Sequence, residues 1–235
     1  MEGAPDPKWK LRLMNTTPAM TVEAITNGIV IAGAVVVYAV ITYGALTGPK
    51  PSGRLTWTAT RFESLSGWRL LAVAFMGWLG VALLTIVLWI PIPLRMSNAG
   101  STIARVAGLL LFLAAVLLIL WGRHTLGPLW TVTTSKGVRL QRGHRLIREG
   151  PYAIVRHPMY LGYWLFVAGP LMIYRTWVLA GYLAVIIPRF LGRARMEDRA
   201  LAEEFGQDWT DYARQVPMLI ARWPFLREDN TVIRM

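Results

Sequence analysis

The amino-acid sequence predicts an all-α, polytopic integral membrane protein, and three features of its composition support this prediction. Of the 235 residues, 54% are hydrophobic and only 16% are charged, whereas soluble domains carry about 25% charged residues. The mean hydropathy is +0.42. The charged residues also cluster, and the runs between them are long enough to cross roughly 30 Å of hydrocarbon as helices. We therefore expect about five transmembrane helices, including a C-terminal helical hairpin.

The first three predicted helices lie within residues 1–121. An uncharged stretch rich in Val, Ile and Ala predicts a helix over about 24–46. A second apolar run predicts a helix over about 68–90, which ends at Pro91–Pro93 because proline lacks a backbone N–H and clashes with the preceding turn. An almost purely aliphatic run predicts the third helix over about 104–121.

Residues 122–235 begin with a basic loop and continue into two further apolar segments, which Arg175 separates. These segments, over about 158–174 and 176–190, predict a helical hairpin with Arg175 near its tip. The second arm is short for a full crossing at ~1.5 Å per residue. Both ends of the hairpin return to the same side whether it crosses fully or only penetrates, so the sequence leaves its depth open.

The basic residues predict the orientation of the chain in the membrane. The formal net charge is +12, and 4, 7 and 8 of the 25 Lys and Arg residues lie at 47–69, at 122–158 and from Arg189 onward, which is 19 altogether. By the positive-inside rule these segments are cytoplasmic and the N-terminus lies outside. Basic loops beside a membrane explain the charge without nucleic acid, and they favour contact with anionic lipid headgroups.

The composition also excludes several kinds of site. Because the chain has no cysteine, it has no disulfide framework, thiolate metal site or cysteine nucleophile. The histidines at 124, 144 and 157 are not spaced as a metal cluster, so no metal site is expected. No Gly-x-Gly-x-x-Gly loop follows a strand, which argues against a soluble Rossmann site. Residues 1–22 are polar and contain prolines, so we expect no cleavable signal peptide.

Nine of the thirteen acidic residues lie from Glu149 onward, around the predicted hairpin. Before the hairpin, Pro158 stands where a helix can begin, since its missing N–H would be unpaired at the first helical position. His157 then lies near the N-cap, and the free N–H groups of the helix start favour an anion such as a cofactor carboxylate. The alternative is that Arg156 and His157 are ordinary interfacial residues.

After the hairpin, apolar residues recur at intervals of three or four from Leu191 to Tyr212. They predict an amphipathic helix that continues from the hairpin and stops or kinks around Gly206. Arg193 and Glu197 share one face of this helix. An Arg four residues before a Glu is the weaker orientation of such a pair, which stabilises a helix by about 0.5 kcal/mol at most. Stability alone therefore gives little reason for the pair, and a solvated face of mixed charge is the alternative.

The two segments together resemble one family of membrane enzymes. The first reads His-Arg-Leu-Ile-x-x-Gly-Pro-Tyr-x-x-x-Arg-His-Pro-Met-Tyr-x-Gly over residues 144–162. The second reads Arg-x-x-x-Glu-Asp-x-x-Leu-x-x-x-Phe-Gly-x-x-Trp-x-x-Tyr over residues 193–212. With a hydrophobic hairpin between them, these motifs are similar to those of the isoprenylcysteine carboxyl methyltransferase family, and related phospholipid methyltransferases share much of the pattern. The resemblance covers about residues 122–223.

This resemblance implies an all-helical enzyme that binds S-adenosylmethionine in a cytosolic-side pocket, between the loop before the hairpin and the helix after it. Glu197 would hold the cofactor and Arg193 the substrate group that is methylated, so these two are the implied catalytic residues. Tyr160 is a further candidate for substrate binding. The other implied cofactor-binding residues are His144, Arg145, Leu146, Ile147, Tyr152, Arg156, His157, Pro158 and Met159. The family has a second Glu where this chain has Asp198, and the role of Asp198 stays open.

Methyl transfer suits these residue types, because a sulfonium methyl is already an activated electrophile that needs alignment with a nucleophile and exclusion of water. A carboxylate acceptor needs no general base. An amine or thiol acceptor must lose a proton, and Glu197, Asp198, Tyr160 and His157 are then unranked candidates for the base. We therefore expect a membrane methyltransferase with a lipophilic or isoprenoid-type acceptor, such as an isoprenylcysteine-like carboxylate, that reaches the site laterally between helices.

Several alternatives stay open at this stage. The acceptor is unknown, so a phospholipid N-methyltransferase and a thiol S-methyltransferase belong to the same class of prediction. A sterol-type membrane reductase using NADPH is an alternative of another class, and a non-catalytic membrane scaffold is a third. Arg outnumbers Lys 21 to 4, a bias common in GC-rich bacteria, so we expect a bacterial inner membrane with the active site facing the cytoplasm. No obligate protein partner is inferred, and the oligomeric state is open.

Overall fold

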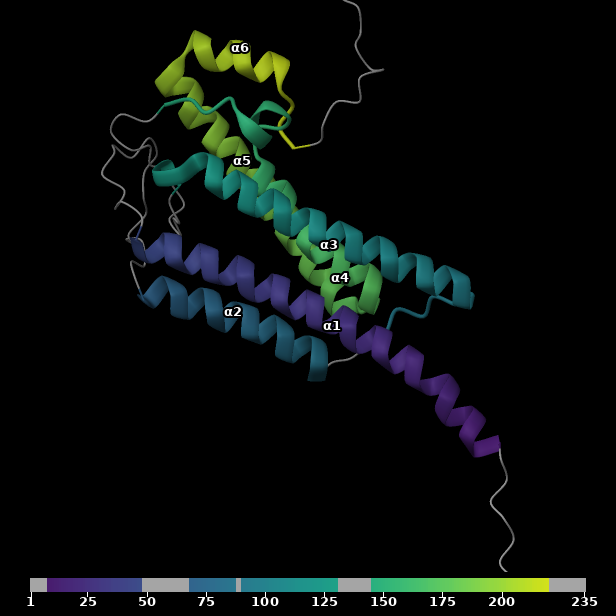
Figure 1. Ribbon diagram of the computed structural model, residues 1–235. Coiled ribbons are helices and arrows are strands. Elements are labelled where there is room, and N and C mark those ends of the chain that lie inside the picture. The colour runs from purple at the N-terminus through teal and green to yellow at the C-terminus, as the bar shows by residue number, and fades with distance from the viewer. Residues whose placement is uncertain (1–7, 48–67, 88–89, 131–144, 220–235) are drawn as a thin grey trace, which may run out of the picture.

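The computed structural model describes residues 8–47, 68–87, 90–130 and 145–219, and this part of the chain is helical (Figure 1). Its α-helices are α1 (Lys8–Thr47), α2 (Trp68–Val87), α3 (Asn98–Leu126), α4 (Pro158–Tyr174), α5 (Trp177–Phe205) and α6 (Gln207–Gln215). Two short 3-10 helices, η1 (Gly127–Leu129) and η2 (Gly150–Ala153), lie in the connections. Within the described residues, β pairing is limited to one isolated bridge. The predicted all-α class is confirmed.

Three stretches of these helices are long and apolar enough to cross a membrane, namely Val22–Gly44, Asn98–Leu129 and Trp177–Phe205. Large apolar side chains along them, such as Ile31, Leu110 and Val185, are exposed in the isolated chain, as expected for surfaces that face lipid. The chain is therefore an integral membrane protein. Helices also occupy the two other places where spans were predicted, and α4 has 17 residues, somewhat below the ~20 of an ordinary span.

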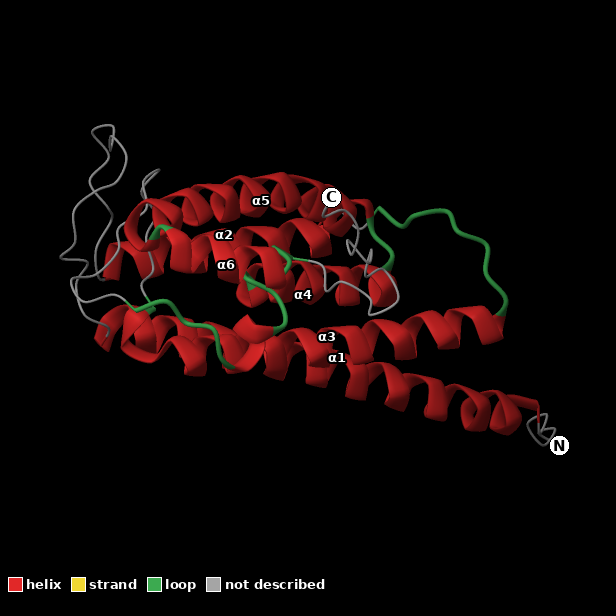
Figure 2. Ribbon diagram, turned by 90° about the horizontal axis from the view of Figure 1, so that it is seen from above, coloured by secondary structure: helices red, strands yellow, loops and turns green. Residues whose placement is uncertain are grey.

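The helices pack as a bundle in which α4 lies against α3, α1 runs alongside α3 (Figure 2) and α2 lies beside α1 (Figure 1). Close approach of α3 to α4 depends on small residues. A Cβ on Gly169 would lie 2.6 Å from the carbonyl oxygen of Gly108, and a Cβ on Gly108 would lie 2.6 Å from that of Gly169. Without a hydrophobic driving force between helices in lipid, such close backbone packing supplies much of their association. Phe112 and Phe166 then meet in the core, with ring centroids 4.8 Å apart.

The turn between α4 and α5 is held by the segment that follows α2. Arg175 ends α4 in the left-handed conformation, with φ 51° and ψ 53°, so it lies at the tip of the hairpin as the sequence predicted. The backbone N–H of Ile92 donates to the carbonyl of Arg175 at 2.7 Å, and that of Trp177 donates to the carbonyl of Ile90 at 3.0 Å. The Pro-Ile-Pro segment, expected only to end a helix, thus also pairs with the hairpin tip.

α1 and α3 (Asn98–Leu126) extend beyond their predicted ranges of about 24–46 and 104–121, whereas α5 continues past the hairpin arm as the sequence predicted. α1 starts at Lys8, well before the predicted start near residue 24. α5 continues from the hairpin arm to Phe205 as one helix, and Gly206, with φ 52°, separates it from α6. A single helix therefore carries both the second arm of the hairpin and the residues Arg193 to Asp198, which places these side chains rigidly relative to α4.

Candidate functional site

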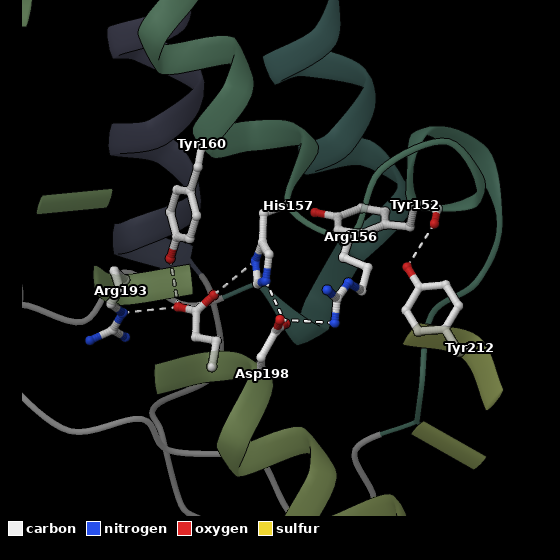
Figure 3. Close-up of polar contacts among 8 residues, drawn as sticks. Tyr152, Arg156, His157, Tyr160, Arg193, Asp198 and Tyr212 are labelled. Atoms are coloured by element: carbon white, nitrogen blue, oxygen red, sulfur yellow. Dashed lines mark hydrogen bonds and ion pairs between the residues drawn. The ribbon is translucent and has the colours of Figure 1, made fainter. Parts of the chain in front are cut away.

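Polar side chains from both motifs meet where α4 begins and the second half of α5 passes it (Figure 3). Pro158 is the first residue of α4 and His157 is its N-cap residue, as the sequence predicted. The His157 side chain makes no capping hydrogen bond to the helix backbone. It is 7% exposed and contacts carboxylates of α5 instead.

Asp198 joins the two residues before Pro158 to α5. Its Oδ1 lies 2.7 Å from Nε2 of His157, and its Oδ2 lies 2.9 Å from Nη1 of Arg156. The Asp198 side chain is only 13% exposed, and buried ion pairs are screened much less than surface ones. The residue whose role was open from the sequence therefore holds both Arg156 and His157 in place.

Glu197 forms a second centre beside the first. Its Oε1 accepts hydrogen bonds from the hydroxyl of Tyr160 at 2.6 Å and from Nε of Arg193 at 2.9 Å. Its Oε2 lies 3.6 Å from Nδ1 of His157. The predicted pair of Arg193 and Glu197 is thus in direct contact, and His157 bridges Glu197 to Asp198 through its two ring nitrogens.

The two carboxylates favour the protonated form of His157. Burial by itself lowers the pKa of His157, but the hydrogen bonds to Asp198 and Glu197 outweigh it, so the pKa is raised above its usual value. Arg156 and Arg193 flank the two carboxylates on the outer sides. The result is a charged row of alternating sign across the start of α4, which consists of Arg193, Glu197, His157, Asp198 and Arg156.

α6 closes this end of the bundle through Trp209 and Tyr212, which belong to the second motif but were assigned no role from the sequence. The hydroxyl of Tyr212 donates to the carbonyl of Tyr152 in η2 at 2.7 Å, and the guanidinium of Arg156 lies 5.4 Å from the ring centroid of Trp209. Burial raises the pKa of Tyr212 to about 12, so the hydroxyl stays a donor at neutral pH. The spacing of Trp209 and Tyr212, three residues apart on one helix face, is the signal that could have identified them.

The chain after α6 also covers the site. The N–H of Arg156 donates to the carbonyl of Pro217 at 2.9 Å, and the N–H of His157 donates to the carbonyl of Met218 at 3.0 Å. These bonds occupy the backbone of the two residues just before α4. No sequence motif indicated this contact, because it involves backbone atoms only.

Other predicted site residues lie apart from the charged row. Arg145 is 72% exposed and pairs with Glu149 at 3.6 Å. Ile147 is buried, Leu146 is half-buried, and Met159 belongs to the apolar core around Phe112. His144 lies outside the described residues. The structure therefore brings together Tyr152, Arg156, His157, Pro158, Tyr160, Arg193 and Glu197 from the predicted set.

Comparison with known proteins identifies the same part of the chain. Residues 107–203 match the model of the isoprenylcysteine carboxyl methyltransferase (ICMT) family. Protein-S-isoprenylcysteine O-methyltransferase B of Arabidopsis thaliana is 33% identical over 81 residues, which are 34% of this chain and 41% of the relative. Methanethiol S-methyltransferase 2 of Bradyrhizobium diazoefficiens is 41% identical over 75 residues, which are 30% of this chain and 27% of the relative.

A solved structure of the eukaryotic intramembrane Ras methyltransferase ICMT is also similar, with a TM-score of 0.45 and 22% identity over 64% of this chain and 51% of that chain. The match to this chain spans less than half of the length of the two curated relatives. The family match runs from α3 into α5 and includes Arg156, His157, Arg193 and Glu197. Residues 107–203 are therefore similar to the isoprenylcysteine carboxyl methyltransferase family.

Proposed function

We propose that this protein is a membrane methyltransferase that uses S-adenosylmethionine to methylate a lipophilic acceptor. The observation that carries the proposal is the contact of Glu197 with Arg193 and Tyr160 beside the start of α4, within the residues that match the family. The relatives named above are methyltransferases by name, and the family match supports the same chemistry here.

The donors and acceptors present fit this cofactor. A carboxylate offers about four acceptor positions, and Glu197 directs only Oε1 at Tyr160 and Arg193. Oε2 of Glu197 faces His157 at 3.6 Å, and the side chain is 25% exposed, so this oxygen suits the cofactor ammonium. Nε of Arg156 is a buried donor without a partner among the described residues, and it suits the cofactor carboxylate together with the start of α4.

The residues around the site then have separate roles in binding, orientation and exclusion of water. S-adenosylmethionine supplies a methyl group that is already activated for transfer, so the protein has to orient the acceptor and exclude water. Glu197 and Arg156 bind the cofactor, and Arg193 orients the acceptor. α6 shields Arg156 through Trp209, which limits access of water from the end of the bundle.

The acceptor class follows from the relatives and the charges of the site. Arg193 suits a carboxylate on a lipophilic tail, which corresponds to the name of the Arabidopsis relative. A thiol acceptor is the second candidate, because the Bradyrhizobium relative is named for methanethiol. The amine of a phospholipid is the third candidate acceptor. Among the candidate bases, Asp198 is engaged by Arg156 and His157, so the Tyr160 and Glu197 pair is best placed to accept a proton from a thiol or amine.

We also propose that the site faces the cytoplasmic side of the membrane. Arg156 and Arg193 belong to the segments that together hold 19 of the 25 basic residues, and the positive-inside rule favours a cytoplasmic location for these segments. The bias toward Arg favours a bacterial inner membrane. Basic loops on that face would bind anionic lipid headgroups.

The proposal is tested by ligand binding to the purified protein in detergent. We expect S-adenosylmethionine to bind with a submillimolar dissociation constant and NADPH to show no saturable binding. Binding of NADPH without binding of S-adenosylmethionine would contradict the proposal and favour a reductase. Mass spectrometry of a membrane extract incubated with isotopically labelled S-adenosylmethionine then identifies the acceptor, and it separates methyl esters from thioethers and methylated amines.

A further inference from the structure

Asp198, His157 and Glu197 form a continuous contact chain whose geometry specifies which proton the imidazole can give up. A carboxylate only accepts hydrogen bonds, so the 2.7 Å contact between Asp198 and Nε2 of His157 requires a proton on Nε2. The second ring nitrogen, Nδ1, faces Oε2 of Glu197 at 3.6 Å. A proton on Nδ1 is therefore present only in the imidazolium, and it is the one that can leave without breaking the shorter contact.

The charges around His157 balance without that second proton. Arg156 and Arg193 carry two positive charges, and Glu197 and Asp198 carry two negative charges. An imidazolium brings the row to a net charge of +1. Among the described residues, phenols from three elements interact with these groups: Tyr152 from η2, Tyr160 from α4 and Tyr212 from α6. Arg148 lies beyond the Tyr212 ring and has its own partner, Asp208.

We propose that His157 exchanges its Nδ1 proton for the cationic end of the bound cofactor. This inference rests on the proposed function and deepens it, because it assigns His157 as a residue that contacts the cofactor and changes its charge on binding, and Asp198 as the positioning residue that acts through His157. An ammonium that donates to Oε2 of Glu197 also reaches Nδ1 of His157, since these atoms are 3.6 Å apart. Neutral Nδ1 is an acceptor for the ammonium, whereas protonated Nδ1 repels it. The Nδ1 proton passes to solvent, and no bond other than N–H breaks.

The exchange predicts a defined linkage between cofactor binding and pH. The two carboxylates raise the pKa of His157 in the ligand-free protein, so the imidazolium persists to higher pH than in an ordinary histidine. If one proton leaves per cofactor bound, the dissociation constant falls about tenfold for each unit of rising pH below the pKa of His157 and levels off above it, up to the pH at which the amine of the cofactor loses its own proton. Asp198 keeps the remaining proton on Nε2, which leaves Nδ1 in the accepting state.

Calorimetric titration of the wild-type protein with S-adenosylmethionine tests this inference. Titrations at one pH near neutrality, in two buffers of different ionisation enthalpy, give the number of protons released. We expect about one proton more from the wild type than from His157→Gln, which has no titratable imidazole. The subtraction also removes any proton exchanged by the amine of the cofactor itself.

A second variant tests whether the negative charge of Asp198 sets the pH at which cofactor affinity levels off. Asp198→Asn keeps an oxygen that accepts from Nε2 but removes one negative charge, so the break in the plot of log Kd against pH should move to lower pH. The matched control is Glu204→Gln, which removes an exposed carboxylate from the same helix and should leave the break unchanged. If either variant fails to fold, the pH dependence of the affinity and the proton release of the wild type still test the inference.

The outcomes separate this inference from the proposed function. No binding of S-adenosylmethionine at millimolar concentration would contradict the proposed function, and this inference with it. Binding whose affinity is constant from pH 6 to 8 and which releases no proton would overturn this inference alone. Equal proton release from wild type and His157→Gln would also overturn it, because the proton would then come from another group.

Discussion

The hydroxyl of Tyr160 donates to Oε1 of Glu197 at 2.6 Å, and this bond joins the first turn of α4 to α5 across 37 residues of sequence. The same oxygen accepts from Arg193, one helical turn earlier on α5. Glu197 therefore receives two donors from two helices while its other oxygen faces His157. The orientation of this carboxylate depends on the packing of both arms of the hairpin.

Replacing Glu197 by Ala should weaken binding of the cofactor strongly. Hydrogen bonds to charged groups contribute about 1.5–3 kcal/mol, so we expect S-adenosylmethionine to bind at least ~10-fold more weakly, measured by calorimetry in detergent. Glu204→Ala on the same helix is the control, since Glu204 is exposed. Equal affinity in the wild type and Glu197→Ala would show that the assignment of Glu197 to the cofactor is wrong.

Replacing Arg193 by Ala should reduce turnover while cofactor binding persists. We expect kcat/KM to fall about 10- to 100-fold, because one charged contact to the acceptor is lost. Tyr160 remains as a donor to Glu197, so the Kd for S-adenosylmethionine should change by less than about threefold. Arg195→Ala, an exposed position two residues away, is the control. If Arg193→Ala binds the cofactor more weakly but keeps its turnover at saturating cofactor, Arg193 is instead assigned to the cofactor.

Adding a methyl group at Gly169 should destabilise the bundle. The new Cβ would lie 2.6 Å from a backbone oxygen of α3, and overpacking of this kind costs about 1–3 kcal/mol. Thermal unfolding in detergent should show a lower Tm for Gly169→Ala. Gly181→Ala is the matched control, because nothing lies within 4 Å of its Cβ position and Ala favours a helix over Gly. A Tm for Gly169→Ala at or above that of Gly181→Ala would contradict the close packing of α3 on α4.

Removing the hydroxyl of Tyr212 should loosen α6 from η2. Tyr212→Phe leaves the carbonyl of Tyr152 without its donor, a loss of about 0.5–1.5 kcal/mol. Hydrogen exchange should become faster in residues 150–157 and 207–215. Tyr182→Phe, on the hairpin arm of α5, is the control. Unchanged exchange in both segments would show that Tyr212 does not anchor α6.

The stability of the protein should depend on the protonation of His157. Its pKa is raised in the folded state above the value of about 6.5 for an unfolded chain. The stabilising contribution is therefore fully present below the unfolded value and is lost as the pH rises through the folded value. The difference in Tm between wild type and His157→Gln should shrink as the pH is raised from 6 to 9. A difference that grows with pH would show that the folded protein prefers neutral His157.

Much of the fold follows from local features of the sequence. Uncharged apolar runs predict where helices lie, because a spanning backbone must satisfy its own hydrogen bonds. Arg175 predicts the tip of the hairpin, and Gly206 predicts the end of α5, because each interrupts a regular pattern. The two motifs predict most of the residues that meet at the site. The start of α1 at Lys8 was not predicted, since the polar residues before the span show no apolar run.

The partners of the site residues are decided only by tertiary packing. Sequence spacing puts Arg193 and Glu197 on one face of a helix, but Asp198 meets His157 across 41 residues and Tyr212 meets Tyr152 across 60 residues. Such pairs depend on how closely α3 and α4 approach and on how α5 passes the start of α4, and periodicity within one helix carries no information about either. The sequence by itself therefore determined a helical membrane protein and the residue types of its site, and the packing of the helices decided which carboxylate faces which cation.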